Sequence, residues 1–372
     1  MARLTPPVLL ATPADLESAW RSIARQSAIA LDTESNSLHA YRERVCLVQI
    51  STPDADYLID PLAPIDLEPL RPMLAAAAVE KVLHACEYDV TGLRRDHGFT
   101  FAGLFDTMWA ARILGWPRVG LADILSERFG VALDKRWQRH DWGRRPLLPE
   151  ALAYARLDTH YLLPLREMQR RELVERGRWD EAQEVFTELA RAAARDDRAS
   201  ETLWRIKGAF DLEPRGRAVL RELAAYREAT ARRLDRPPFK VMGDRTLIEI
   251  AAQRPTRLEQ LRGVTGMTQA QINRHGAGVL SAVAHGKQAA PPKPPPRQAA
   301  DLAVIARYER LRQWRKQAAA ARGVDPDVII SNAALMALAR RNPRRESELG
   351  GVDGLGPWRR QTYGRALLET LK

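Results

Sequence analysis

The first 195 residues alternate short, mostly apolar runs with segments of helical periodicity. Apolar runs bounded by polar residues predict buried strands, and such runs lie at residues 28–31, 44–51, 56–60 and 80–85. The first three follow one another closely, as strands joined by hairpins do, and predicted helices surround the fourth. This succession indicates a mixed α/β sheet packed with helices, in a domain that we place at residues 1–195.

Apolar residues spaced three and four positions apart predict the helices of this domain. The longest pattern covers residues 149–173. It begins with Pro149, a favourable first helical residue, and it contains Pro164, where we expect a kink. The shorter predicted helices span residues 67–78, 87–96, 106–114 and 120–129.

The rest of the chain is helical in pattern and contains an internal repeat. A shift of 88 residues without gaps gives at least thirteen identities over about 65 positions, where composition alone would give roughly five. The identities are mostly apolar, Gly or Pro residues, which set a fold. We therefore predict two copies of one all-α module at residues 201–286 and 301–372, joined by a Pro/Ala-rich linker at 287–300. We expect this linker to let the second module grip RNA at variable distance.

Charge divides the chain in the same place. Residues 1–200 hold 26 Lys and Arg against 30 Asp and Glu, whereas residues 201–372 hold 32 against 17, so the net charge of +11 lies wholly in the modules. This asymmetry indicates either that the basic half holds a polyanion for the acidic half or simply a solvated basic surface.

Composition and motifs exclude several classes of protein. The two cysteines, Cys46 and Cys86, have no metal-ligand spacing and lie in apolar runs, as in a reducing compartment. The sequence has neither a run long enough for a membrane helix nor the layout of a signal peptide, so we expect a cytoplasmic protein. It also lacks the P-loop, H-E-x-x-H and G-x-S-x-G motifs, which disfavours a helicase motor, a zinc protease and an α/β-hydrolase.

Two carboxylates follow the first predicted strand, in the stretch IALDTES. Asp32 and Glu34 are at i and i+2, so their side chains leave a strand on the same face. Like charges placed so closely repel, and burial strengthens the repulsion. Such a pair calls for a cation, and carboxylate oxygens are good ligands for Mg²⁺ or Mn²⁺.

Further acids occupy comparable settings. Asp89 opens a predicted helix just after the strand at 80–85, and Tyr154 and Asp158 are one helical turn apart, hence on one face. Each has an ordinary alternative: Asp32 as a turn residue, Asp89 as an acid favoured by the helix dipole, and the Tyr/Asp pair as a solvated face. Together they make a candidate catalytic and metal-binding set.

The motifs around these residues resemble those of the DEDD family of 3′–5′ exonucleases. DTES at 32–35 resembles the first motif, HACEYDVTGL at 84–93 the second, and YARLDTHYL at 154–162 the third motif of the tyrosine branch. Many members have an aromatic residue where this chain has Ser35. DWGRRPL at 141–147 resembles a segment of ribonuclease D, and the modules resemble HRDC domains. The whole layout is similar to that of the bacterial ribonuclease D family.

The resemblance implies a ribonuclease H-like mixed-sheet exonuclease domain followed by two all-α HRDC domains. It implies two divalent ions, Mg²⁺ or Mn²⁺, held by Asp32, Glu34, Asp89 and Asp158, with Tyr154 orienting the attacking water. The implied activity releases 5′-mononucleotides from RNA 3′ ends, tRNA precursors among them. A DNA-directed exonuclease and a non-catalytic RNA-binding scaffold remain open alternatives.

Four residues near the motifs are candidates for substrate contacts. His84 ends a strand and is either a substrate contact or a structural residue. Trp142, Arg144 and Arg145 combine an aromatic ring with basic groups in one loop, which could stack a base and hold a phosphate. Trp142 could equally anchor that loop to the core. Gln49 alternates with apolar neighbours and faces either the cleft or solvent.

Overall fold

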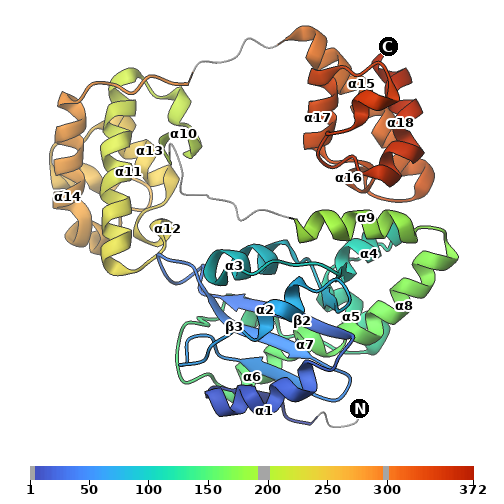
Figure 1. Cartoon of the computed structure of the whole chain (residues 1–372). Coiled ribbons are helices and arrows are strands. Elements are labelled where there is room, and N and C mark those ends of the chain that lie inside the picture. Colours follow the sequence, from blue (N-terminus) through green and yellow to red (C-terminus); the bar gives the residue numbers. More distant parts are fainter. Residues whose placement is uncertain (1–4, 192–201, 296–300) are drawn as a thin grey trace. The chain divides into compact units, whose positions relative to one another are not determined.

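The computed structural model describes residues 5–191, 202–295 and 301–372, and their elements are shown in Figure 1. The described residues form two compact units. One comprises the described parts of 1–35, 45–194 and 299–372. The other comprises residues 36–44 and the described part of 195–298.

The first unit is built on a six-stranded mixed sheet. Its strand order is β1-β4-β3-β2-β5-β6; β2–β3 and β3–β4 are antiparallel, and the other three pairs are parallel. The strands are β1 Val8–Leu10, β2 Ala28–Ser35, β3 Val45–Ser51, β4 Asp56–Ile59, β5 Glu80–Leu83 and β6 Leu104–Asp106. The mixed sheet and the four longer strands agree with the prediction from sequence, which lacked β1 and β6.

The two faces of the sheet are both covered. All seven residues of β3 are buried, as a central strand with helices on each side requires. Leu47 packs with Ala151 and Tyr154 of one helix, whereas Val48 and Ile50 belong to the main core of the domain. The helices are α1 Pro13–Ile23, α2 Leu70–Ala75, α3 Glu87–His97, α4 Thr107–Leu114, α5 Leu121–Phe129, α6 Pro149–Ala155, α7 Leu157–His160, α8 Leu162–Glu175 and α9 Trp179–Ala190.

The prediction of one continuous helix at 149–173 is wrong. The chain breaks at Arg156 and at Tyr161, giving α6, α7 and α8. The expected kink at Pro164 does not occur. Pro164 is the third residue of α8, where a backbone N–H has no intrahelical partner and its loss costs little. The helix predicted at 67–78 is shorter than expected, since α2 spans only Leu70–Ala75.

Each helical module has its own apolar core. The first contains α10 Thr202–Arg205, α11 Pro214–Leu234, α12 Pro238–Val241, α13 Asp244–Gln253 and α14 Gln269–Gln288. The second contains α15 Leu302–Arg322, α16 Pro326–Ile329, α17 Asn332–Arg341 and α18 Pro357–Leu371. These ranges repeat from α11–α14 to α15–α18 at the spacing that the sequence shift predicts.

The repeat extends to details of geometry. A buried arginine in the first long helix of each module donates to a backbone carbonyl: Arg227 to Met242 O at 3.1 Å, and Arg315 to Ile330 O at 2.8 Å. Left-handed residues then end matching helices, with φ of 52° at Arg254 after α13. The matching φ at Asn342, after α17, is 49°.

The second module packs on the exonuclease domain instead of ranging freely from it, which corrects our expectation for the linker. Val328 of α16 is fully buried in the main core of that domain. The backbones approach closely here: Gly115, after α4, has φ of 76°, and a Cβ on it would lie 2.4 Å from Gly323 O. Only glycine satisfies both conditions.

Ion pairs complete this contact. Arg322 of α15 binds Glu181 of α9, whose side chain is fully buried. Glu184, also on α9, accepts the N–H of Trp358 at 2.6 Å and pairs with Arg359 at 3.1 Å, so it caps the N-terminus of α18. No helix in the described part of the chain is both long and apolar enough to cross a bilayer.

Candidate active site

The β2 strand presents the first two acids at a place where its pairing changes. β2 pairs with β3 from Ala30 to Ser35, but it pairs with β5 only from Ala28 to Ala30. The half of β2 that bears Asp32 and Glu34 therefore has a sheet neighbour on one side alone within the described sheet. Both side chains are half-buried, and the open edge leaves room for acids from other elements.

The third acid comes from α7. Oxygen atoms of Asp32, Glu34 and Asp158 lie within 4.8 Å of one another. Two oxygens that bind one Mg²⁺ at about 2.0–2.1 Å lie at most about 4.2 Å apart, so small side-chain movements would let these oxygens share one cation. Residues 126 positions apart in sequence thus meet at one point.

Asp89 joins the cluster from the first turn of α3. It is 5 % exposed, and its Oδ1 accepts the Thr33 hydroxyl at 2.5 Å, which ties it to β2. The turn into α3 is itself fixed by Asp106, whose carboxylate accepts the Cys86 N–H at 2.7 Å and the Trp109 N–H at 2.9 Å. Sequence reasoning overlooked Asp106, although an acid between an apolar run and a helix is a typical N-cap.

The acids raise one another's pKa. Burial, together with the charges of Asp89, Asp158 and Glu34, raises the pKa of Asp32 well above its usual range. Burial likewise raises the pKa of Glu34, and it raises the pKa values of Asp89 and Asp158 to about 7.

The cluster also lacks a protein cation. Among the residues that the structure describes, no Lys or Arg side chain pairs with any of the four acids, Asp32, Glu34, Asp89 and Asp158. A buried, uncompensated set of carboxylate oxygens fits hard divalent ions such as Mg²⁺ or Mn²⁺.

Tyr154 lies in α6, just before the break that leads to α7. Burial and the charges of Asp158, Glu34 and Asp32 raise the pKa of its phenol well above the ordinary value. The phenol therefore stays protonated near neutral pH and can act as a hydrogen-bond donor. Its ring packs with Trp142, with ring centroids 6.5 Å apart.

Two of the four predicted substrate contacts, Trp142 and Arg145, are held by contacts within the domain. Trp142 is 2 % exposed and anchors its loop to the core, so its ring has no face open to a base. The Arg145 guanidinium uses all five N–H groups: two on Asp60 and one each on the carbonyls of Cys46, Trp142 and Arg144. All five donors therefore have protein partners, which favours a structural role for Arg145.

The other two candidates, His84 and Arg144, differ in how available they are to a substrate. His84 Nδ1 lies 2.9 Å from the Thr107 hydroxyl, and burial lowers the pKa of His84, so the imidazole is neutral near pH 7. Arg144 is 80 % exposed in its side chain and has only a loose pair with Asp141, at 3.5 Å. Arg144 is therefore the one of the four that remains available for a phosphate.

Gln49 faces neither solvent nor an open cleft. It is fully buried on β3, directly opposite Asp32 in the sheet register, and its amide oxygen and nitrogen have no partner among the described residues. Paired residues of antiparallel strands lie on the same face, so the amide lies beside the acidic cluster. The sequence predicted its alternation but not its burial.

Comparisons with known proteins agree with this geometry. A family model described as 3′-5′ exonuclease matches residues 7–173, and an HRDC domain model matches residues 216–283 and 305–371. Ribonuclease D of Pseudomonas paraeruginosa is 30% identical over 370 residues, covering 95% of this chain and 93% of that protein. Ribonuclease D of Granulibacter bethesdensis is 30% identical over 375 residues, covering 99% and 93%.

A solved structure also matches over almost the whole length of the chain. The crystal structure of Escherichia coli RNase D, described as an exoribonuclease involved in structured RNA processing, superposes with a TM-score of 0.72. The two sequences are 26% identical, and 99% of each chain is covered. The fold class predicted from sequence is confirmed. The chain belongs to the ribonuclease D family and is a 3′–5′ exoribonuclease.

Proposed function

We propose that this exoribonuclease uses two divalent ions, Mg²⁺ or Mn²⁺, held by Asp32, Glu34, Asp89 and Asp158, to trim the 3′ ends of structured RNA such as tRNA precursors. The observation that carries the proposal is the cluster of carboxylates: oxygens of three acids lie within 4.8 Å of one another, and a fourth acid is tied to the same strand. The products are 5′-mononucleotides.

Each acid has a distinct role in this proposal. Asp32 is central, since its pKa is raised by the charges of all three other acids, and it would bridge the two ions. Glu34 and Asp158 would hold the ion on the water side, and Asp89 would hold the second. When bound, two such ions activate water and stabilise the leaving oxygen of an in-line phosphoryl displacement.

Tyr154 orients the attacking water in this scheme. Its phenol is held protonated, so it donates a hydrogen bond and does not remove a proton. It lies one turn before Asp158 in the chain, and the packing of its ring on Trp142 fixes its direction. Tyr154 would therefore raise the reaction rate by holding the attacking water in line with the bond that breaks.

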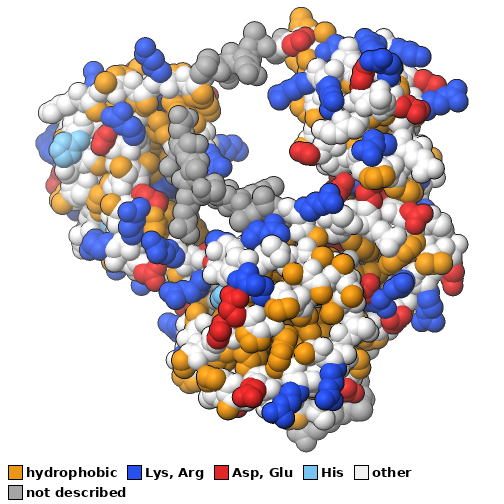
Figure 2. Space-filling view, in the orientation of Figure 1, with side chains coloured by type: hydrophobic (Ala, Val, Ile, Leu, Met, Phe, Trp, Pro, Cys, Tyr) orange, Lys and Arg blue, Asp and Glu red, His pale blue; other side chains and the backbone are white. Residues whose placement is uncertain are grey.

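The basic modules support an RNA substrate. Figure 2 shows Lys and Arg side chains on the visible faces of the modules and of the exonuclease domain. From the end of α11 through the connecting turn to α12, four basic side chains are exposed: Arg232, Arg233, Arg236 and Lys240. Contacts of this kind give affinity for a phosphate backbone without reading sequence.

The test is a time course on 5′-labelled RNA and DNA strands of one sequence with the same single-stranded 3′ tail, in Mg²⁺, in Mn²⁺ and in EDTA. A tRNA precursor and an unstructured RNA of equal length form a second pair. We expect stepwise shortening of RNA from the 3′ end in either metal and none in EDTA. Asp158→Asn should lose at least about 100-fold in rate, as removal of a group that acts on the transition state does.

The alternatives give different patterns. Equal or faster shortening of DNA would favour the DNA-directed reading of the same site. RNA binding without shortening under any metal condition would leave a non-catalytic scaffold. Shortening that survives EDTA would overturn the metal assignment itself.

A further inference from the structure

The helix that carries Asp158 cannot hold its own position. α7 spans only Leu157–His160 and lies between the breaks at Arg156 and Tyr161. A single helical turn is unstable alone, because nucleation fixes several dihedral angles for one hydrogen bond. Contacts from elsewhere must therefore fix the place of Asp158 in the acidic cluster.

The side chains around Asp158 divide between two faces. Tyr154 and Asp158, four residues apart, point toward the cluster. Arg156, Thr159 and His160 are spaced i, i+3 and i+4, so they share a face, and at 100° per residue that face lies about 150° away from Asp158. One side of this segment thus serves the acids, and the opposite side is free to be anchored.

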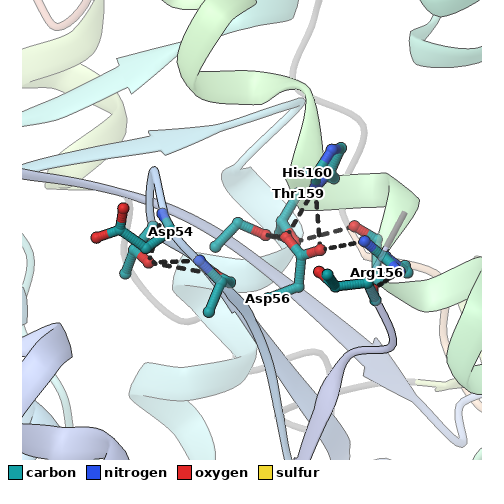
Figure 3. A network of polar contacts seen from close by, with 9 residues as sticks. Asp54, Asp56, Arg156, Thr159 and His160 are labelled. Atoms are coloured by element: carbon teal, nitrogen blue, oxygen red, sulfur yellow. Dashed lines mark hydrogen bonds and ion pairs between the residues drawn. The ribbon is translucent and has the colours of Figure 1, made fainter. Parts of the chain in front are cut away.

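Asp56 is the anchor on that opposite side. Its buried carboxylate accepts from Arg156 Nη2 at 2.7 Å, from His160 Nδ1 at 2.9 Å and from the Ser51 hydroxyl at 2.7 Å. The Ser51 hydroxyl also lies 2.7 Å from the Thr159 hydroxyl. Figure 3 shows Arg156 and His160 directed at Asp56, with Thr159 beside them.

The anchor is charged and rigid. Burial alone would raise the pKa of Asp56, but hydrogen bonds from His160 and Ser51 and the charge of Arg156 lower it below the ordinary value. Arg156 and Asp56 are 6 % and 5 % exposed in their side chains. Asp56 begins β4 and pairs in register with Ser51 at the end of β3, so the sheet itself holds the carboxylate.

We propose that Asp56 is a positioning residue for the metal site: by holding Arg156 and His160 directly, and Thr159 through Ser51, on the β3–β4 hairpin, it fixes Asp158 and so sets the affinity of the acidic cluster for a divalent ion. The inference rests on the proposed function, since it takes the four acids to bind metal. Outer groups that orient metal ligands typically change affinity or activity by about 10–100-fold when removed.

The test measures Mn²⁺ binding directly, on the full metal-free chain without RNA, from the free-Mn²⁺ signal in electron paramagnetic resonance. We expect Asp56→Asn to weaken Mn²⁺ binding about tenfold. Thr52→Ala is the matched control. The Thr52 hydroxyl accepts the Ala55 N–H at 3.1 Å within the same hairpin and does not touch α7, so this variant should bind Mn²⁺ as the wild type does.

A second readout separates positioning from general damage. If Asp56 positions a ligand, raising Mn²⁺ should restore exonuclease activity in Asp56→Asn but not in Asp158→Asn. Should Asp56→Asn fail to fold, Thr159→Val replaces it. This near-isosteric change removes the contact of the Thr159 hydroxyl with Ser51 and its 3.3 Å bond to the Arg156 carbonyl within the same segment, and we expect about threefold weaker Mn²⁺ binding.

Three results decide between the possibilities. Wild-type Mn²⁺ affinity in a folded Asp56→Asn, or in Thr159→Val, would overturn the positioning role while leaving the proposed function intact. Equal weakening in Thr52→Ala would also overturn it, because hairpin damage would then explain the effect. A wild type that binds no Mn²⁺ and trims RNA in EDTA would overturn the proposed function and this inference with it.

Discussion

Glu181→Ala should loosen the second module from the exonuclease domain at a substantial cost in stability. The Glu181 carboxylate is fully buried, and it accepts two hydrogen bonds from Arg322, at 2.8 and 2.5 Å. Removing one partner of a buried pair leaves the other charge uncompensated, which costs about 3–5 kcal/mol. Arg322 keeps its bond to the Tyr363 hydroxyl, at 2.6 Å, so we expect the lower end of that range.

The effect is large enough to measure by calorimetry of the full chain. For cooperative units of 150–250 residues, 1 kcal/mol corresponds to about 2–4 °C in Tm, so a loss of 3 kcal/mol lowers Tm by about 6–12 °C. The control is Glu309→Ala, which removes a 3.4 Å pair with Arg312 whose side chains are 55 % and 62 % exposed. Pairs so exposed contribute about 0–1 kcal/mol.

A double variant tests the cause. Replacing both Glu181 and Arg322 by Met removes the charges together and fills similar space, so stability should return to near the wild-type value. A Tm for Glu181→Ala within 2 °C of the Glu309→Ala control would refute the claim that this ion pair holds the second module in place.

Three further predictions follow from the site. Without metal, the free energy of unfolding should fall by about 5 kcal/mol between pH 5 and pH 8, because the native state keeps protons on Asp89 and Asp158, with pKa values of about 7, that the unfolded chain has released. Thermal unfolding in EDTA measures this, and a flat profile would contradict it; saturating Mn²⁺ should remove the slope. Gln49→Leu should stabilise the metal-free protein by about 1–3 kcal/mol in urea unfolding, because it removes a buried amide without partners; destabilisation would mean that an ordered water or ligand satisfies that amide. Arg145→Ala should destabilise the fold by about 3 kcal/mol, since the Asp60 carboxylate loses both of its bonds to Arg145, whereas Arg144→Ala should leave Tm unchanged and lower the salt dependence of RNA binding by about one phosphate contact. If Arg144→Ala lowered Tm and Arg145→Ala weakened only RNA binding, the roles given to these two arginines would be wrong.

The sequence was sufficient where the signal is local. Asp32 and Glu34 were placed correctly because a period of two is unambiguous beside a buried apolar run. Tyr154 and Asp158 were paired by a spacing of four that survives the helix break between them. The repeat was visible because the residues shared by the two modules are those that set turns and cores, such as the matching buried Arg227 and Arg315.

The sequence was insufficient where the determinant is a distant partner. β1 and β6 have three residues each, too few for a period, and exist only through pairing with β4 and β5. No local pattern within residues 149–173 predicts the breaks on either side of α7. Asp56 looked like an ordinary strand end, because its partners lie 100 and 104 positions away.

The residues with which the second module contacts the exonuclease domain differ from their counterparts in the first module. At the shift of 88, Arg322, Val324 and Val328 correspond to Leu234, Arg236 and Lys240 of the first module. A first module placed on α9 would set a leucine against the buried Glu181 and bring a lysine into the core position of Val328. The two copies are therefore not interchangeable: the first module lacks the residues that would let it take the place of the second on α9.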